Sequence, residues 1–427
     1  MICSCNESKF IQGIVECISC TTLNSTPLFV AKYPVGVNYR AMDIELLLDI
    51  ESNRVLMVGI HGLGGIGKTT IAKAVYNIIA NHFEGSSFLE NVREQSRTND
   101  GIIQLQEKIL FDITRDRNLK VDNISRGINV IKERLHCKRV LLVLDDVDKP
   151  NQIENLLRDY KCFAPGSRIL ITTRDKHVLN TLEKDPIVYK VGQMDRHEAL
   201  ELFSLHAFRT KEPELSYLQL AKQIIDYAIG LPLALRILGS DLHGRSLCQW
   251  KSAVEKLKRI PNNEIQEILK ISYEGLDPSE QEIFLDIACF FKGKKIGYVL
   301  KLLEACNLYP AYGIPKLVDK CLITIDWCDN LLMHDLLQQM GKEIVKQESP
   351  EVLGKRTRLW KYEDARNILI GKTVLVLFLH LFSFFYTVEA RSNELFSSFF
   401  NVEANISFSI YFFFKISKFL HFYKFYI

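Results

Sequence analysis

Apolar and polar residues alternate between two different patterns along the first half of the chain. Short apolar segments typical of buried strands occur at 55–60, 86–92, 138–148, 167–174 and 187–191. Between them, over 71–80, 102–111 and 124–136, apolar residues recur every three or four positions, which predicts amphipathic helices. Strands that alternate with helices favour a parallel sheet with right-handed crossovers and helices on both faces. The pattern therefore predicts a three-layer α/β domain.

The second half of the chain has a different pattern. From His197 onward helical periodicity dominates, and the stretches 198–208, 217–229 and 232–243 predict a helical domain. Further helices are expected at 265–273, 279–291, 296–306 and 314–320. A short strand at 322–325, a turn at 329–330 and a last helix that opens at 331–335 follow. Helices followed by a hairpin favour a winged-helix domain.

A glycine-rich turn joins the first predicted strand to its helix. It matches the pattern G-x-x-x-x-G-K-[ST] from Gly62 to Thr69 and continues with Thr70. In such a P-loop the backbone N–H groups surround phosphate oxygens, the lysine reaches the outer phosphates and the hydroxyl binds Mg²⁺. The predicted nucleotide-binding residues of the turn are Gly62, Gly64, Gly65, Ile66, Gly67, Lys68, Thr69 and Thr70.

Two carboxylates follow the apolar run that starts at Lys138. Asp145 and Asp146 end this strand, at the edge where ligands of open α/β sheets bind. Beside a P-loop, Asp145 is expected to hold Mg²⁺ together with Thr69, and Asp146 to orient or deprotonate the attacking water. With Lys68 they are the candidate catalytic residues. The alternative is that both carboxylates only cap the next helix.

A third apolar strand, 167–174, ends in Thr172, Thr173 and Arg174. In P-loop ATPases whose catalytic-carboxylate strand is separated from the P-loop strand, the intervening strand often ends in a polar residue near the γ-phosphate. Arg174 is therefore the candidate sensor of that phosphate, and the alternative is a solvated arginine paired with Asp175. The chain contains no Asn-Lys-x-Asp guanine signature, so adenine is favoured over guanine.

The charge, hydrophobic content and cysteine placement of the chain limit the kinds of partner and cellular location to be expected. A net charge of +3 without a dense basic block gives no argument for nucleic acid as a partner. Apolar residues make up 47% of the chain and charged residues 25%, values of a soluble globular protein. Cysteines scattered within apolar segments are typical of reduced, buried thiols, which favours a cytoplasmic location and leaves a nuclear one open.

Taken together, the motifs resemble the NB-ARC module of plant disease-resistance proteins, the nucleotide-binding leucine-rich-repeat receptors. The resemblance extends over about 35–370 and rests on the P-loop and on motifs in the family's order: FEGSSFLENVRE (83–94), LLVLDDVD (141–148), GSRILITTRD (166–175), GLPLA (230–234), FLDIACFF (284–291) and Met333-His334-Asp335. FLENVRE, FLDIACFF and Asp148 are similar to the subclass with an N-terminal TIR domain. Neither that domain nor leucine-rich repeats are recognisable in the sequence.

The resemblance implies a fold, domain limits and further site residues. The fold is a P-loop NTPase three-layer parallel sheet followed by a helical domain and a winged-helix domain. Backbone groups around Val37 would contact adenine, Pro232 would pack on the base, and His334 would touch the β-phosphate of ADP. The expected ranges are a linker remnant at 1–34, the P-loop domain at 35–192, an ARC1-like helical domain at 193–264, an ARC2-like winged helix at 265–350, a linker at 351–372 and an apolar, aromatic-rich tail at 373–427.

Family members act as switches that are compact with ADP and open with ATP, with slow hydrolysis resetting the ADP state. The resemblance therefore implies an ADP/ATP-binding switch with Mg²⁺, at most a slow ATPase, in an innate-immune receptor. The alternatives are a P-loop ATPase whose turnover is the output, and a truncated fragment that does not signal. Self-association and association with other immune receptors both remain open as partners.

The last 55 residues, 373–427, change in character and begin with the apolar stretch TVLVLFLHLFSFFYTV. This stretch is shorter than the roughly 18–20 residues that a membrane-spanning helix needs, and it lacks the polar face of an interfacial anchor. The enriched residues are those encoded by AT-rich codons. We therefore favour translated intron sequence over membrane contact for this tail.

Overall fold

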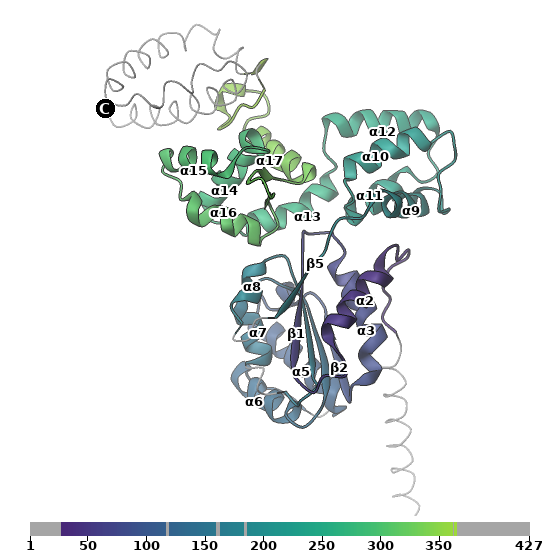
Figure 1. The fold of residues 1–427 in the computed structure, drawn as a ribbon, viewed down its shortest axis with the longest axis vertical. Coiled ribbons are helices and arrows are strands. Elements are labelled where there is room, and N and C mark those ends of the chain that lie inside the picture. The colour runs from purple at the N-terminus through teal and green to yellow at the C-terminus, as the bar shows by residue number, and fades with distance from the viewer. Residues whose placement is uncertain (1–26, 117–118, 159–162, 183–185, 362, 365–427) are drawn as a thin grey trace, which may run out of the picture. The chain divides into compact units, whose positions relative to one another are not determined.

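The computed structural model describes residues 27–116, 119–158, 163–182, 186–361 and 363–364. The chain divides into two compact units (Figure 1). The first unit comprises Met1–Lys256 together with Asp319–Cys321, and the second comprises Leu257–Val318 and Leu322–Ile427. Each unit is described separately below.

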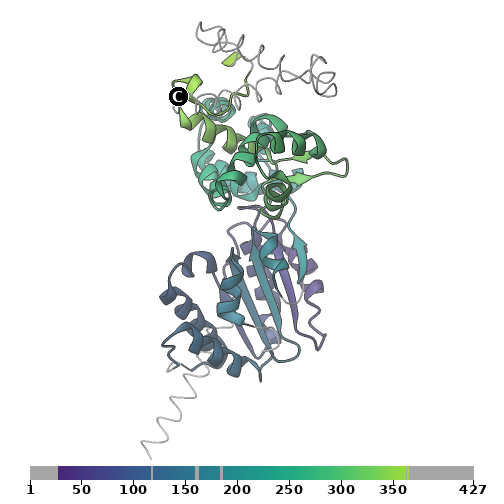
Figure 2. The ribbon, with the colours of Figure 1, turned by 90° about the vertical axis from the view of Figure 1, so that its left-hand side faces the viewer.

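The first unit is built around a parallel sheet. Within the described residues its strands are β1 (Leu56–His61), β2 (Gly85–Leu89), β3 (Val140–Val147), β4 (Arg168–Thr173) and β5 (Ile187–Lys190). They pair in the order β2-β3-β4-β1-β5, all parallel, and Figure 2 shows them side by side. The carboxylate strand β3 is therefore separated from the P-loop strand β1 by β4. The predicted α/β fold class is confirmed.

Helices cover both faces of the sheet, with α2 and α3 on one side and α6, α7 and α8 on the other (Figure 1). On the side of α5–α7, Leu142 and Leu144 of β3 and Ile169 and Ile171 of β4 belong to one buried core. The intervening residues of both strands are also buried, which explains the uninterrupted apolar runs. The helices are α2 (Val37–Leu48), α3 (Lys68–Ile79), α4 (Val92–Gln95), α5 (Asn99–Thr114), α6 (Ile124–Leu135), α7 (Pro150–Leu157) and α8 (Lys176–Asn180), with a 3₁₀ turn at Ala80–His82.

One strand is shorter than its sequence pattern predicts. The segment 86–92 suggests a single strand, but β2 ends at Leu89 and α4 begins at Val92. Asn91 between them has a φ of 52°, which turns the chain out of the extended conformation. Asparagine tolerates this left-handed region better than most residues, so the apolar pattern continues across a turn that it cannot reveal.

The remainder of the first unit is helical, as predicted. Its predicted helices are α9 (Arg196–Ala207), α10 (Leu218–Ala228) and α11 (Pro232–Leu242), and α12 (Leu247–Arg259), which was not predicted, begins in this unit and ends past its limit at Lys256. The ring of Trp250 stacks on Phe208 and lies edge-on to Phe203 and Tyr217. Its indole N–H donates to the carbonyl of Leu242 at 3.1 Å. This aromatic cluster fixes α12 against α9 and α11.

The second unit has the helix–hairpin order predicted for a winged helix. Its helices α13 (Asn263–Glu274), α14 (Pro278–Asp286), α15 (Ile296–Ala305) and α16 (Pro310–Asp319) precede the antiparallel strands β6 (Thr324–Ile325) and β7 (Leu331–Leu332), then α17 (Asp335–Glu348) and a 3₁₀ turn at Leu353–Lys355. One predicted helix, 279–291, instead changes to a π-helix over Ile287–Phe291. The Gln338 amide donates to the carbonyl of Ala288 inside that π-helix at 3.0 Å.

An ion-pair network joins Arg358 to α14 within this unit. The Arg358 Nε lies 2.5 Å from the Asp286 carboxylate, and its Nη2 lies 2.6 Å from that of Glu282. The predictions for the tail at 373–427, including the apolar stretch, lie outside the described residues. Over the part of the chain that the structure describes, no helix is both long and apolar enough to cross a membrane.

Candidate nucleotide-binding site

The glycine-rich turn between β1 and α3 is shaped by two residues with positive φ. Gly65 has a φ of 79° and Gly67 a φ of 100°, a region that other residues rarely adopt. Gly67 precedes α3, and no side chain caps this helix end. The N–H groups of the first turn of α3 therefore have no acceptor within the helix, and the helix dipole adds positive charge there. The sequence thus folds locally into a helix end with the geometry expected of an anion-binding site.

The ammonium of Lys68 is hydrogen-bonded to backbone carbonyls of the P-loop itself. Its Nζ donates to the carbonyls of Gly62 at 2.8 Å and Leu63 at 3.0 Å. Burial, reinforced by the nearby Arg174 cation, lowers the pKa of Lys68 to about 8. An anion close to this ammonium would offset its lost hydration. This environment fits the predicted contact with phosphate.

Asp145 and Thr69 lie side by side, as a magnesium site requires. One oxygen of Asp145 accepts hydrogen bonds from the hydroxyls of Thr69 at 2.8 Å and Thr172 at 2.7 Å. Burial raises the pKa of Asp145, and the two hydroxyl groups oppose that rise. A hydroxyl and a carboxylate are the hard oxygen ligands that Mg²⁺ prefers. These two residues therefore fit the ion, and Mg²⁺ binding itself stays a prediction.

The alternative role for the two carboxylates was to cap the helix that follows. At the start of α7, however, the Gln152 amide bonds to Asp148, with the Nε2–Oδ1 distance at 2.8 Å. Asp145 instead faces Thr69, and Asp146 pairs with Arg174, whose Nε lies 3.2 Å from the Asp146 Oδ1. The neighbouring Asp175 accepts from the backbone N–H of His177 at the start of α8. The contacts of both aspartates thus differ from those of helix caps, and their roles in Mg²⁺ binding and hydrolysis stay predictions.

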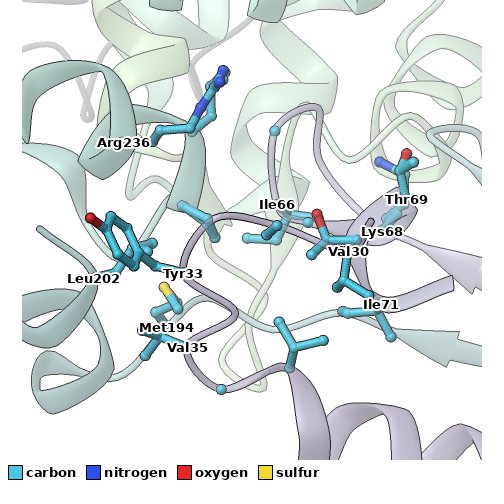
Figure 3. Close-up of a pocket in the computed structure, with 18 of the residues that line it drawn as sticks. Val30, Tyr33, Val35, Ile66, Lys68, Thr69, Ile71, Met194, Leu202 and Arg236 are labelled. Carbon is cyan, nitrogen blue, oxygen red and sulfur yellow. The ribbon is translucent and has the colours of Figure 1, made fainter. Parts of the chain in front are cut away.

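A cavity of about 640 Å³ opens in front of the P-loop. One wall carries Lys68 and Thr69, and the other carries Tyr33, Met194 and Leu202 (Figure 3). The predicted site residues that line the cavity are Val37, Gly65, Ile66, Gly67, Lys68, Thr69, Thr70, Asp146, Arg174 and Pro232. Gly62, Gly64 and Asp145 do not line it, although the carbonyl of Gly62 accepts from Lys68 and Asp145 accepts from Thr69.

The start of α11 lies directly against the phosphate-binding turn. The backbone N–H of Leu233 donates to the carbonyl of Gly65 at 3.2 Å. A side chain at position 65 would meet Leu233, because a Cβ there would lie 2.7 Å from two of its side-chain atoms. The glycine-proline motif before α11 signals a helix start, and the contact with Gly65 adds a role in closing the cavity.

Other lining residues were not predicted. Tyr33 meets the ring of His206 edge-on at 4.9 Å, and Arg236 of α11 lies nearby in the wall. Burial, followed by the charges of Lys32 and Arg236, lowers the pKa of His206. Tyr33 belongs to the segment 29–33, which the sequence suggested to be a linker. Nothing in the sequence indicated that residues ahead of Val35 line the cavity, because no local pattern marks them.

A buried ion pair fixes the segment that carries Val37. Both nitrogens of the Arg40 fork meet the Glu198 carboxylate, at 2.8 and 2.9 Å, and Nη1 also donates to the carbonyl of Gly36 at 2.6 Å. Burial alone would raise the pKa of Glu198, but hydrogen bonds from Arg40 and Tyr39 hold it at about 2. Residues 36–40 are thereby fastened to α9, which places Val37 at the cavity.

His334 lies in the second unit, where it precedes α17. Its Nδ1 accepts from the backbone N–H of Leu336 at 3.2 Å, so the side chain caps the helix. The adjacent Met333 is buried. The predicted contact between His334 and ADP would join two units that are described separately, so it stays a prediction.

Comparison with known families agrees with the order of the elements. Residues 42–213 match the NB-ARC domain model. Residues 277–349 match the model "Disease resistance protein Roq1-like, winged-helix domain". The two models together cover the P-loop domain, part of the helical segment and the second unit's helix–hairpin region.

Similar proteins come from plants. The chain is 45% identical over 336 residues to disease resistance protein RUN1 of Vitis rotundifolia, covering 78% of this chain and 25% of that protein. It is 40% identical over 375 residues to TMV resistance protein N of Nicotiana glutinosa, covering 86% and 32% respectively. The chain thus spans about a quarter to a third of the length of these relatives.

Among solved structures, the Walker-type ATPase PABY2304 of Pyrococcus abyssi aligns with a TM-score of 0.49 at 14% identity, over 72% of this chain and 96% of that one. With its P-loop, its β2-β3-β4-β1-β5 sheet and its winged-helix match, the chain belongs to the NB-ARC family of plant disease-resistance proteins.

Proposed function

We propose that the chain is the ADP/ATP-binding switch module of a plant innate-immune receptor, with slow ATP hydrolysis resetting an ADP-bound resting state. The cavity carries this proposal. Its phosphate end is the P-loop with Lys68, and its opposite wall is the segment 29–37 together with α9 and α11. A nucleotide would place its phosphates on the first turn of α3, with Mg²⁺ held by Thr69 and Asp145.

The position of the cavity supports a switch. A ligand there would contact the sheet part and the helical part of the same unit, which already meet at Gly65 and Leu233. A ligand shifts a conformational equilibrium only by its difference in affinity between the two states. ADP and ATP differ by the terminal phosphate. Arg174 and Asp146 line the cavity, so the two nucleotides would make different contacts with them.

The second candidate is an ATPase whose turnover is itself the output. Asp145, Asp146 and Lys68 favour it, because they have the chemistry of P-loop hydrolysis. The pairing of Asp146 argues for slow turnover. Its two carboxylate oxygens lie 3.2 Å from the Arg174 Nε and 3.0 Å from an Arg93 nitrogen. Oδ1, the oxygen that Arg174 holds, can therefore orient a water only after Arg174 has moved away from it.

Exchange and turnover rates distinguish the two candidates. The switch predicts that bound fluorescent ADP leaves slowly and that ATP turnover stays far below about once per second, the lower end of ordinary enzyme rates. Both rates can be followed on the same preparation by fluorescence release and phosphate production. Freely exchanging ADP with turnover near once per second or faster would contradict the switch and favour the ATPase.

A receptor role for this chain remains part of the proposal. Self-association or association with other immune receptors is expected for a module of this kind, and the cytoplasm stays the predicted location. A fragment that binds nucleotide without signalling would share every site feature described above. The nucleotide-binding predictions therefore apply to either case.

A further inference from the structure

Asp146 occupies an irregular point in the sheet. The pairing of β3 with β4 runs regularly to Leu144 opposite Ile171 and resumes at Val147 opposite Thr173, so the strand bulges at the two aspartates. Asp146 has a φ of 57°, which costs free energy for a residue with a side chain. Its backbone N–H donates to the Thr172 hydroxyl at 2.8 Å. Bulges of this kind re-aim a side chain next to a functional site.

Two arginines from different elements hold the re-aimed carboxylate. The Arg174 Nε, at the end of β4, lies 3.2 Å from Oδ1, and the Arg93 Nη2, on α4, lies 3.0 Å from Oδ2. Arg174 and Asp146 line the cavity, whereas Arg93 does not. The two guanidinium groups are therefore not equivalent, because a ligand in the cavity meets only one of them.

We propose that Arg93 is a positioning residue for hydrolysis. Arg93, which does not line the cavity, holds Oδ2 of Asp146. Arg174 can then leave Oδ1 and bind the terminal phosphate of a nucleotide. Oδ1 then faces the cavity and can orient water. This inference rests on the proposed function, since it assigns a role in the hydrolysis that resets the switch.

The burial of Asp146 gives the physical reason for two arginines. Its side chain is only 15% exposed, and a poorly hydrated carboxylate that loses every partner is strongly destabilised. With Arg174 alone, transfer of that arginine to phosphate would leave Asp146 without a counter-ion. With Arg93 also in place, one ion pair persists throughout the exchange, and the carboxylate keeps its orientation.

The contacts of Arg93 also favour this role over general stabilisation. Besides Asp146 it pairs with the adjacent Glu94 at 3.5 Å. Its Nε is buried and, among the described residues, has no hydrogen-bond partner. An arginine that served mainly to tie elements together would use more of its five donors. Within the described ranges, its one ion pair beyond its sequence neighbour goes to Asp146.

The test combines binding and single-turnover hydrolysis in Arg93→Ala, Arg93→Lys and the control Arg97→Ala. Arg97 also pairs with Glu94, at 3.0 Å, but its side chain is 71% exposed. We expect Arg93→Ala to slow hydrolysis about 10- to 100-fold, the usual effect of a slightly misplaced group. Its affinity for ADP should stay within about threefold of the original chain. Arg93→Lys should recover part of the rate, and Arg97→Ala should match the original chain.

Chemical rescue separates positioning from folding. Guanidinium ion at millimolar concentration should raise the rate of Arg93→Ala but not that of Arg93→Ala combined with Asp146→Asn. An unchanged rate in Arg93→Ala overturns the proposal, as does a parallel loss of ADP affinity or a guanidinium effect that survives Asp146→Asn. If Arg93→Ala does not fold, a full rate in a folded Arg93→Gln also overturns it. Failure of the unaltered chain to bind ADP would contradict the proposed function instead.

Discussion

Replacing Lys68 with alanine is expected to weaken ADP binding about 100-fold while leaving the chain folded. A charge-assisted hydrogen bond contributes about 1.5–3 kcal/mol, and 3 kcal/mol corresponds to roughly a 100-fold change in Kd. Within the described residues, the hydrogen bonds of the buried Lys68 ammonium go to the backbone carbonyls of Gly62 and Leu63 and not to a carboxylate. Its removal therefore takes away a partly dehydrated charge together with two hydrogen bonds, so the unliganded fold should lose little.

Lys73 provides a matched control for this substitution. It lies on the same helix, α3, but its ammonium pairs with Glu90 at 2.8 Å and it does not line the cavity. Titration with fluorescent ADP should give Lys73→Ala the original affinity. ADP affinity in Lys68→Ala equal to that of the control would refute the assignment of the P-loop as the phosphate site.

Replacing Asp146 with asparagine is expected to slow ATP hydrolysis at least 100-fold and to leave ADP binding within a few-fold. Asparagine has nearly the same shape but cannot accept a proton, and general-base catalysis typically contributes 10²- to 10⁴-fold. Binding should persist because Lys68 and the first turn of α3, rather than Asp146, would form the proposed phosphate cradle. Phosphate release over many hours, compared with ADP titration, measures both quantities.

Asp148 is the control for that substitution. It lies two positions further along, but its carboxylate accepts from Gln152 at the start of α7 instead of facing the cavity. Asp148→Asn should therefore hydrolyse ATP at the original rate. If Asp146→Asn is equally fast, Asp146 has no part in hydrolysis, and the role inferred for Arg93 fails with it.

Much of the fold follows from local sequence patterns. The P-loop motif begins directly after β1 and marks the turn and the start of α3, and two of its glycines, Gly65 and Gly67, adopt the positive φ that the turn needs. The apolar runs mark β3 and β4, since both faces of these strands are buried. The same runs cannot give the order β2-β3-β4-β1-β5, because a strand buried on both faces carries no preference for its neighbour.

The candidate site was less predictable than the fold. Lys68, Thr69 and Asp145 sit in motifs whose chemistry can be recognised locally. Arg93 could not be assigned, because the role that we propose for it depends on Asp146, which lies 53 positions away on β3, whereas Arg93 lies on α4. The same holds for Tyr33 and His206, which meet across the cavity wall. Long-range contacts of this kind leave no periodicity in the sequence.

The central claim is that the cavity beside the P-loop is an adenine-nucleotide site occupied in the resting state. The most direct measurement is to denature the purified protein and quantify the released nucleotide by chromatography. The account predicts about one ADP per chain, with guanine nucleotides absent. A folded chain that releases no adenine nucleotide, and that also fails to bind added ADP at millimolar concentration, would contradict it.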